Sequence, residues 1–292
     1  MDGFFADNVE NLQKSTPNEV NLRTKLNKAN YMKTVIVPVD FSETSVHAAK
    51  YAAQLLTGHN GVTMLLYHSF SKPVEAVNAN GALENLKTEL NKEHNVNIET
   101  LAFEEDDFVD GLEKTARHRS ADLVIMGITG KSAIAQVLFG SNTLKMAERK
   151  VCPVLIVPQQ ASFNPVKHVM LTSDFKNTVD STPSEPIKKF LDMVSAQLHI
   201  VNVDSEHYIS LTEAYEKEKQ DMKQLFAAYK PEFYFMRLYD IDEAINLFAD
   251  SRNIDLIIAI QKNHSFIAKM LSASRTKALS YHSKVPIMVM HE

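Results

Sequence analysis

Three glycines, Gly127, Gly130 and Gly140, lie close together in the segment GITGKSAIAQVLFGSN. The chain has only 8 glycines, and none follows Gly140. Glycine allows positive φ and close approach of the backbone to a ligand. The segment follows the apolar run ADLVIM and precedes the helical pattern NTLKMAERK, where Ser141 and Asn142 offer further hydrogen-bond donors. Backbone amides in such a strand-to-helix connection typically bind phosphate, so we predict a phosphate site here.

Two alternative roles of this segment stay open. The glycines can close two tight turns without a ligand, and Ser141 and Asn142 can be ordinary helix caps. A P-loop is excluded because Gly127 and Gly130 enclose only two residues and Ile125 stands where its first glycine belongs. The chain also lacks the G-x-G-x-x-G pattern of dinucleotide-binding proteins.

Strands and helices are expected to alternate around these glycines. The apolar run TVIVPVD predicts a strand buried on both faces, and FSETSVHAAKYAAQLLTG has the spacing of a helix. The alternation continues to PVLIVP, which predicts an α/β fold with a doubly wound, Rossmann-like arrangement of five mainly parallel strands flanked by helices.

Asp40 ends the first of these strands, and Gly127 ends the fourth. Ligands of open parallel sheets bind at the carboxyl ends of the strands, where the strand order reverses. We therefore expect Asp40 and Gly127 on neighbouring strands at that point. The Asp40 carboxylate can accept hydrogen bonds from ribose hydroxyls or an adenine amino group, although a turn or helix-capping aspartate is the alternative.

The pattern then repeats along the chain. The segment VKHVMLTSDF matches MKTVIVPVDF and places Asp174 on Asp40, while IDLIIAI matches ADLVIMG and KVPIMVM matches VCPVLIV. Two copies of one fold are therefore expected, in residues 32–158 and 166–292, after an extension of residues 1–31 that lies largely outside the fold or forms a short helix docked on a partner. The glycine motif is not repeated, because Ile260, Asn263 and Ala273 replace its glycines.

The ends of the two copies predict how they associate. The strands PVLIVP and PIMVM are apolar edge strands without protecting charges. Such edges favour pairing, so we expect them to pair with each other in an intramolecular pseudo-dimer. Whether the tandem unit dimerises further is left open.

Composition excludes several classes of protein. The 292 residues carry a net charge of −5, which argues against nucleic-acid binding. No apolar run approaches the length of about 20 residues that spans a bilayer, so we expect no membrane partner. The single cysteine, Cys152, lies in the apolar run VCPVLIVP and is expected to be an inert core thiol. The N-terminus lacks a secretory signal, so the cytoplasm is the expected location.

The segment VIVPVDFSETS, the G-x2-G-x9-G-S-N motif and PVLIVP together resemble the universal stress protein family. The resemblance covers residues 32–158 in order, and residues 166–291 resemble the same family with a degenerate motif. It implies a stress-response regulator whose first copy binds ATP, with or without Mg²⁺, and an unknown protein partner. The nucleotide-binding residues that it implies are Pro38, Val39, Asp40, His68, Met126, Gly127, Gly130, Gly140, Ser141, Asn142 and Thr143.

Three functions remain distinct at this point. The first is a regulatory module that binds ATP or a related adenine nucleotide without dedicated catalysis. The second is a slow ATPase or autophosphorylating enzyme, for which Asp40 is the only credible base or metal-binding carboxylate near the phosphates. The third is a scaffold without a ligand.

Overall fold

The computed structural model describes residues 31–128, 141–204, 213–237, 241–261 and 284–292. The chain divides into two compact units, Met1–Tyr31 and Met32–Glu292.

The expected alternation of strands and helices is confirmed in both copies. The elements of the first copy are β1 (Thr34–Pro38), α2 (Glu43–Leu56), β2 (Thr63–Phe70), η1 (Pro73–Glu75), α3 (Ala76–Glu93), β3 (Asn97–Glu104), α4 (Phe108–His118), β4 (Leu123–Ile128), α5 (Ser141–Glu148) and β5 (Val154–Pro158). Those of the second are β6 (His168–Thr172), α6 (Thr178–Ser181), α7 (Ser184–Val194), β7 (Gln197–Asp204), α8 (Glu213–Leu225), η2 (Ala227–Tyr229), β8 (Glu232–Arg237), α9 (Ile241–Ser251), β9 (Leu256–Gln261) and β10 (Ile287–His291).

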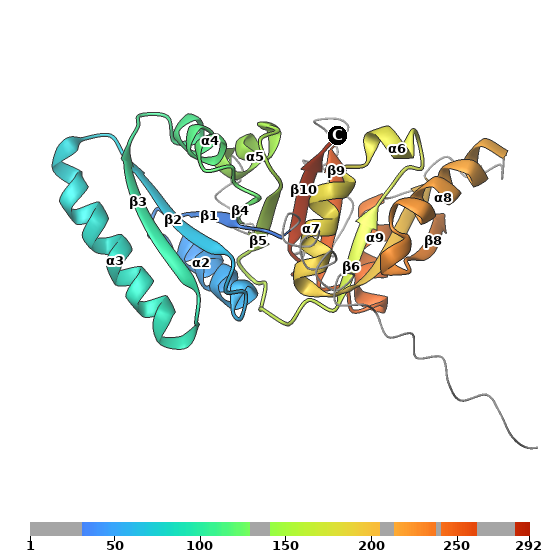
Figure 1. Ribbon diagram of the computed structural model, residues 1–292, viewed down its shortest axis with the longest axis horizontal. Helices are drawn as coiled ribbons and strands as arrows, with labels where there is room; N and C mark the ends of the chain where they lie inside the picture. Colours follow the sequence, from blue (N-terminus) through green and yellow to red (C-terminus); the bar gives the residue numbers. More distant parts are fainter. Residues whose placement is uncertain (1–30, 129–140, 205–212, 238–240, 262–283) are drawn as a thin grey trace, which may run out of the picture. The chain divides into compact units, whose positions relative to one another are not determined.

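The ten strands form one continuous sheet in the order β3-β2-β1-β4-β5-β10-β9-β6-β7-β8 (Figure 1). All pairings within each half are parallel. The halves meet where β5 pairs antiparallel with β10, with Val289 opposite Val154. The predicted pairing of these two edge strands is therefore confirmed, and the two predicted five-stranded sheets are joined into one.

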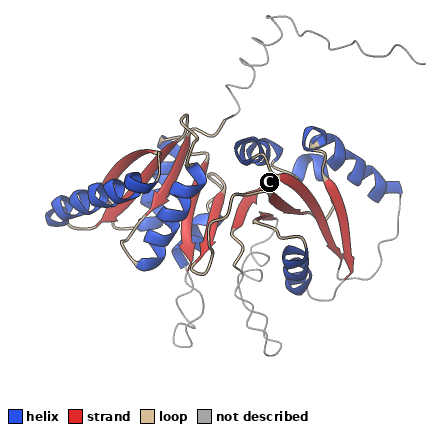
Figure 2. Ribbon diagram, turned by 90° about the horizontal axis from the view of Figure 1, so that it is seen from below, coloured by secondary structure: helices blue, strands red, loops and turns tan. Residues whose placement is uncertain are grey.

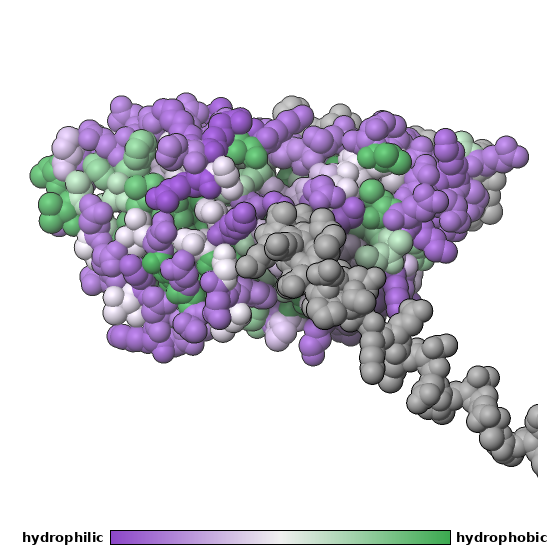
Figure 3. Space-filling model, in the orientation of Figure 1, coloured by the Kyte–Doolittle hydropathy of each residue, from purple (hydrophilic) through white to green (hydrophobic). Residues whose placement is uncertain are grey.

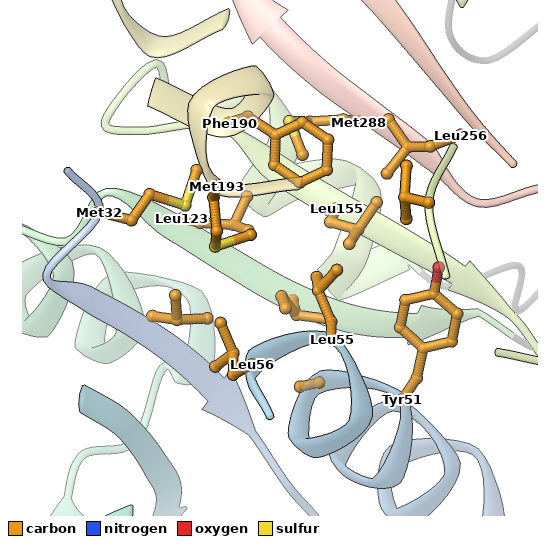
Figure 4. Packing of buried hydrophobic residues seen from close by; sticks show 14 of the residues in the cluster. Met32, Tyr51, Leu55, Leu56, Leu123, Leu155, Phe190, Met193, Leu256 and Met288 are labelled. Atoms are coloured by element: carbon orange, nitrogen blue, oxygen red, sulfur yellow. The ribbon is translucent and has the colours of Figure 1, made fainter. Parts of the chain in front are cut away.

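Helices cover both faces of the sheet, as Figure 2 shows. Buried side chains of α2, α3, α7 and α8 belong to the core on one face, and those of α4, α5 and α9 to the core on the other. The first core runs across the junction of the halves, where Leu155 and Met288 lie close to Phe190 and Met193 of α7 (Figure 4). Burial of this apolar surface is the main force that holds the halves together.

An ion pair also bridges the two halves. The Lys189 ammonium on α7 lies 2.9 Å from Oδ1 of Asp122, which precedes β4. The other oxygen of Asp122 accepts from the backbone amides of Lys33 and Thr34 at 2.7 and 3.2 Å. One largely buried carboxylate thus fixes the start of β1 and contacts a helix of the second half.

The first helical segment of the second copy is divided where the first copy has one continuous helix, α2. Pro183 lies between α6 and α7, and a proline inside a helix removes a donor and clashes with the preceding turn. In the second copy, α8 ends at Leu225, and the 3₁₀ turn η2 follows it.

Candidate functional site

The carboxyl ends of β1, β2 and β4 gather most of the predicted site residues that the structure describes. β1 lies between β2 and β4, so the strand order reverses at the β1–β4 pair. Asp40 follows β1, His68 lies near the end of β2, and Gly127 lies near the end of β4. The predicted neighbourhood of Asp40 and Gly127 across this switch point is confirmed by the β1–β4 pairing.

Asp40 is exposed and shapes the turn that leads into α2. Its Oδ1 accepts from the Ser42 amide at 3.0 Å, and its own amide donates to Ser45 Oγ at 3.2 Å. Partial burial opposes ionisation of the carboxyl, but hydrogen bonds from Ser42 and Ser45 together outweigh it and lower the pKa of Asp40. Because the residue is exposed, this ionised carboxylate is accessible from outside the turn.

The serines of this turn were not among the predicted site residues. Ser42 is the N-cap of α2, and its hydroxyl accepts from the Ser45 amide at 3.3 Å. The segment FSETS does carry the signal, because serine before a helical pattern is a common N-cap. The alternative role of Asp40, a turn aspartate, is thus also present in the structure, and both roles fit one side chain.

His68, near the end of β2, lies beside the end of β1 on the side opposite β4. Its Nδ1 lies 2.7 Å from the Val39 carbonyl oxygen, which can only accept, so Nδ1 carries the proton and Nε2 is the acceptor of the neutral ring. The Phe41 ring packs against His68 with centroids 4.9 Å apart. Phe41 has φ of 62°, a left-handed value that is rare for a bulky residue and that periodicity cannot reveal.

Gly127 is a place of close backbone approach, and its neighbour is the protein itself. A Cβ at this position would lie 2.5 Å from the Thr44 carbonyl oxygen and 2.7 Å from Thr44 Cγ2. The Gly127 carbonyl in turn accepts from the buried Thr143 hydroxyl at 3.0 Å. Gly127 therefore lets the start of α2 pack on β4, and Thr143 ties the start of α5 to the same strand.

The remaining predicted residues fall into two groups. Pro38, Val39 and Met126 are buried, and the Val39 backbone already bonds to His68 Nδ1 and to the Tyr67 carbonyl. Gly130 and Gly140 lie outside the described residues, Ser141 is described only as the first residue of α5, and Asn142 is exposed.

The corresponding edge of the second copy carries different side chains. Asp174 Oδ1 accepts from the Lys176 amide at 3.1 Å, as Asp40 does from Ser42. Asn202 Nδ2 donates to the Ser173 carbonyl at 2.9 Å, in the place of the His68–Val39 contact.

The aromatic residue after Asp174 is more deeply buried than its counterpart in the first copy. Phe175 is 3% exposed and packs against Tyr215 of α8 and Phe235 of β8. Glu218 of α8 also accepts from the Thr178 amide at 2.7 Å. Side chains of the second copy's own helix thus cover this edge.

The acidic segment EEDD and the single cysteine have structural explanations. In the segment EEDD, Asp107 caps α4 and Glu105 contacts the Lys114 ammonium at 2.6 Å. The described residues contain no group of three metal-ligating side chains. Burial raises the pKa of Cys152 to about 12, which fits the predicted inert thiol.

The surface and the helices add two observations. Figure 3 shows a mainly hydrophilic face, with apolar residues at the end that carries α3, where Val74 and Val77 are 80% and 81% exposed. Among the described residues, no helix combines the length and the apolar character needed to cross a membrane.

Comparison with known proteins places this fold in a family. The sequence pattern of the universal stress protein family matches residues 32–158 and 192–291. A universal stress protein of Methanocaldococcus jannaschii is 28% identical over 145 residues, which are 45% of this chain and 85% of that protein. One from Thermus aquaticus is 27% identical over 135 residues, 43% of this chain and 98% of that protein.

A solved structure agrees in fold over both halves. The universal stress protein from Archaeoglobus fulgidus has a TM-score of 0.62 at 17% identity, over 89% of this chain and 97% of that one. Two matched stretches, together more than half of the chain, carry the assignment, and family membership supports a role in the stress response. The chain belongs to the universal stress protein family.

Proposed function

We propose that the first half binds ATP at the carboxyl ends of β1, β2 and β4 and acts as a nucleotide-dependent regulator of a protein partner. The observation that carries the proposal is the pair of hydrogen-bonding groups at this edge. Asp40 exposes an ionised carboxylate and His68 presents Nε2, both beside the switch point where open parallel sheets bind ligands.

Each group has a defined part in the proposed complex. The Asp40 carboxylate accepts from a ribose hydroxyl, and His68 Nε2 accepts a hydrogen bond from the adenosine moiety. The start of α5, held on β4 through Thr143 and Gly127, directs its positive dipole end to the phosphates together with the predicted glycine segment. Magnesium, if it accompanies the nucleotide, binds through phosphate oxygens.

The second half is proposed not to bind ATP. Ile260 stands where Gly127 does in the first half, so a side chain replaces a hydrogen atom at the edge of the equivalent strand. Phe175 is buried under α8, whereas Phe41 is partly exposed. One nucleotide per chain is therefore expected.

Regulation rather than catalysis fits the described residues. The Asp40 carboxylate is assigned to the ribose in this proposal, and no other side chain at this edge is proposed as a base for an attacking water. We expect phosphate release well below about 1 per second, the lower end of typical enzymes.

The single, poorly reactive cysteine fits a reducing compartment, so we propose a cytoplasmic location.

Two equivalent aspartates provide the test. Isothermal titration with ATP is expected to show one site, and Asp40→Ala should weaken binding at least about tenfold, the equivalent of 1.4 kcal/mol. Asp174→Ala is the matched control, because it removes the same kind of turn hydrogen bond from the other half. Gly130→Val and Gly140→Val should also abolish binding.

Two results would contradict ATP binding by the first half. Absence of binding heat with the unmodified protein would leave the scaffold function. Equal losses in Asp40→Ala and Asp174→Ala would show that the effect comes from the turn and not from a ligand contact.

A further inference from the structure

Two histidines face each other within the second half. His168 begins β6, His199 lies on the neighbouring strand β7, and His168 Nδ1 is 3.1 Å from His199 Nε2. On the far side of His199, Nδ1 is 3.6 Å from the Glu232 carboxylate at the start of β8. The Tyr234 hydroxyl donates to the same carboxylate. We call His168, His199, Glu232 and Tyr234 the histidine cluster.

The fold itself does not require this cluster. His199 is opposite Glu232 in the register of β7 and β8, just as Leu65 is opposite Glu99 in that of β2 and β3. Leu65 is 1% exposed and His199 4%, so an imidazole replaces a core leucine. Tyr234 likewise takes the position of Leu101. A buried polar group is costly unless it is paired, so the second half retains it at the expense of packing.

The charges around His199 determine which nitrogen carries its proton. A proton on Nδ1 points toward the Glu232 carboxylate, whereas a lone pair there would face a negative charge. His199 Nε2 is then the acceptor, and His168 Nδ1 is the donor. One additional proton can bind to Nε2 of His168, because the resulting cationic imidazole still donates through Nδ1 to His199.

A second proton cannot be taken up in this geometry. It would place N–H groups on both facing nitrogens at 3.1 Å and bring two positive rings together. Arg252, which lies over the Tyr234 ring at 4.9 Å, adds a further positive charge. Two carboxylates oppose them: Glu232, whose side chain is 53% exposed and therefore partly screened by water, and Asp255, which accepts from the His168 amide.

The groups that face the pair come from several neighbouring elements. They are Glu232 and Tyr234 from β8, Arg252 beyond α9, and Asp255, whose carboxylate accepts from the His168 amide at 2.9 Å. Phe248 of α9 supplies an apolar wall, with its ring centroid 6.2 Å from that of His199. Burial lowers the pKa of His199 below its ordinary value, Glu232 opposes this, and His168 and Arg252 add to it.

We propose that the histidine cluster is an acid-sensitive latch, in which a second proton on the histidine pair breaks the His168–His199 bond and loosens β6, β7, β8 and the end of α9 from one another. The latch does not depend on nucleotide binding. The first half has no such pair, because leucine stands at the equivalent position.

Hydrogen exchange of the full chain, measured by mass spectrometry and corrected for the intrinsic rate, tests the latch. In the open form, the second proton binds with the ordinary histidine pKa of about 6.5. The population of the open form should therefore increase below that pH, by up to about tenfold per pH unit. Between pH 7.5 and 5.0, we expect this increase in segments 197–202 and 232–236. Segment 97–104 of the first half, which contains no histidine, is the internal reference.

The deciding variant is His199→Leu, which restores the residue of the first half. It should remove the acid-induced opening, while His118→Leu, at an exposed histidine on α4, should keep it. If His199→Leu does not fold, His168→Thr, which introduces the residue type of the equivalent Thr34, should reduce the acid-induced opening. Equal opening at both pH values in the unmodified protein, or an unchanged acid response in the deciding variant, would overturn the proposal.

Discussion

At the scale of single residues, the same residue type has different structural roles at different positions in the fold. Gly127 accommodates the Thr44 carbonyl, whereas a Cβ added to the exposed Gly81 in α3 would meet nothing within 4 Å. Asp40 both shapes a turn and leaves its negative charge accessible. The chemical context of each residue, and not its type, decides what its substitution costs.

The two glycines allow a paired prediction. Gly127→Ala should lower the free energy of unfolding by about 1–3 kcal/mol, because the added methyl overlaps Thr44 and forces α2 away from β4. Gly81→Ala should raise it by about 0.5–1 kcal/mol, since alanine is the better residue inside a helix. Urea unfolding of both variants measures the difference, and equal effects would contradict the packing role of Gly127.

At the scale of elements, the ends of helices are specified by side chains that satisfy free backbone groups. Asp107 accepts from the amides of Val109 and Asp110 at 2.9 and 3.0 Å and so defines where α4 begins. The hydrogen bond from Asp110 is the main cause that lowers the pKa of Asp107. Since α4 packs on the β2 side of the first half, this cap contributes to the stability of the half that carries the candidate site.

Asp107→Ala is therefore expected to destabilise the fold at neutral pH, because two amides at the start of α4 lose the oxygen that caps them. The folded-state pKa is lowered, so the unfolded chain binds the proton more readily. The contribution of the cap is then fully present above about pH 5 and fades as the pH falls through the folded-state pKa. Thermal unfolding at pH 7 and in acid checks this, with Asp106→Ala as the exposed neighbouring control. A cost that is the same at both pH values would contradict the capping role.

At the scale of the whole described unit, the halves meet in the antiparallel β5–β10 pair and in the core across it, while residues 159–165 connect them along the chain. Val289 is fully buried opposite Val154, and the Lys189–Asp122 ion pair also crosses between the halves. Apolar burial in this junction, and not the covalent connection, should keep the halves together.

A protease site inserted after the exposed Asn164 tests this statement. After cleavage, the two halves should still elute together in size-exclusion chromatography. Adding Val289→Asp should separate them, because it buries an unpaired charge at a cost of several kcal/mol. Val74→Asp, at a position 80% exposed, should have no such effect. Separation of the cleaved but otherwise unmodified protein would show that the connection is required.

Much of this architecture is determined by the sequence alone. Apolar runs of the length of β1, β4 and β5 can only be strands buried on both faces, and alternation with amphipathic helices leaves a parallel sheet as the solution. The repeated pattern around Asp40 and Asp174 identifies two copies, and their uncharged edges predict the β5–β10 pair. The position of Asp40 beside the switch point also follows from the order of the strands.

Other features are decided only by the tertiary structure. Periodicity reports which face of an element is buried but not which residues, far apart in the chain, come within a few ångströms of each other. The contact of Gly127 with Thr44, the His68–Val39 hydrogen bond and the His168–His199 pair all depend on strand register and helix placement. For the same reason, the sequence could mark glycine as a place of close approach, while only the folded chain showed that a neighbouring helix makes that approach at Gly127.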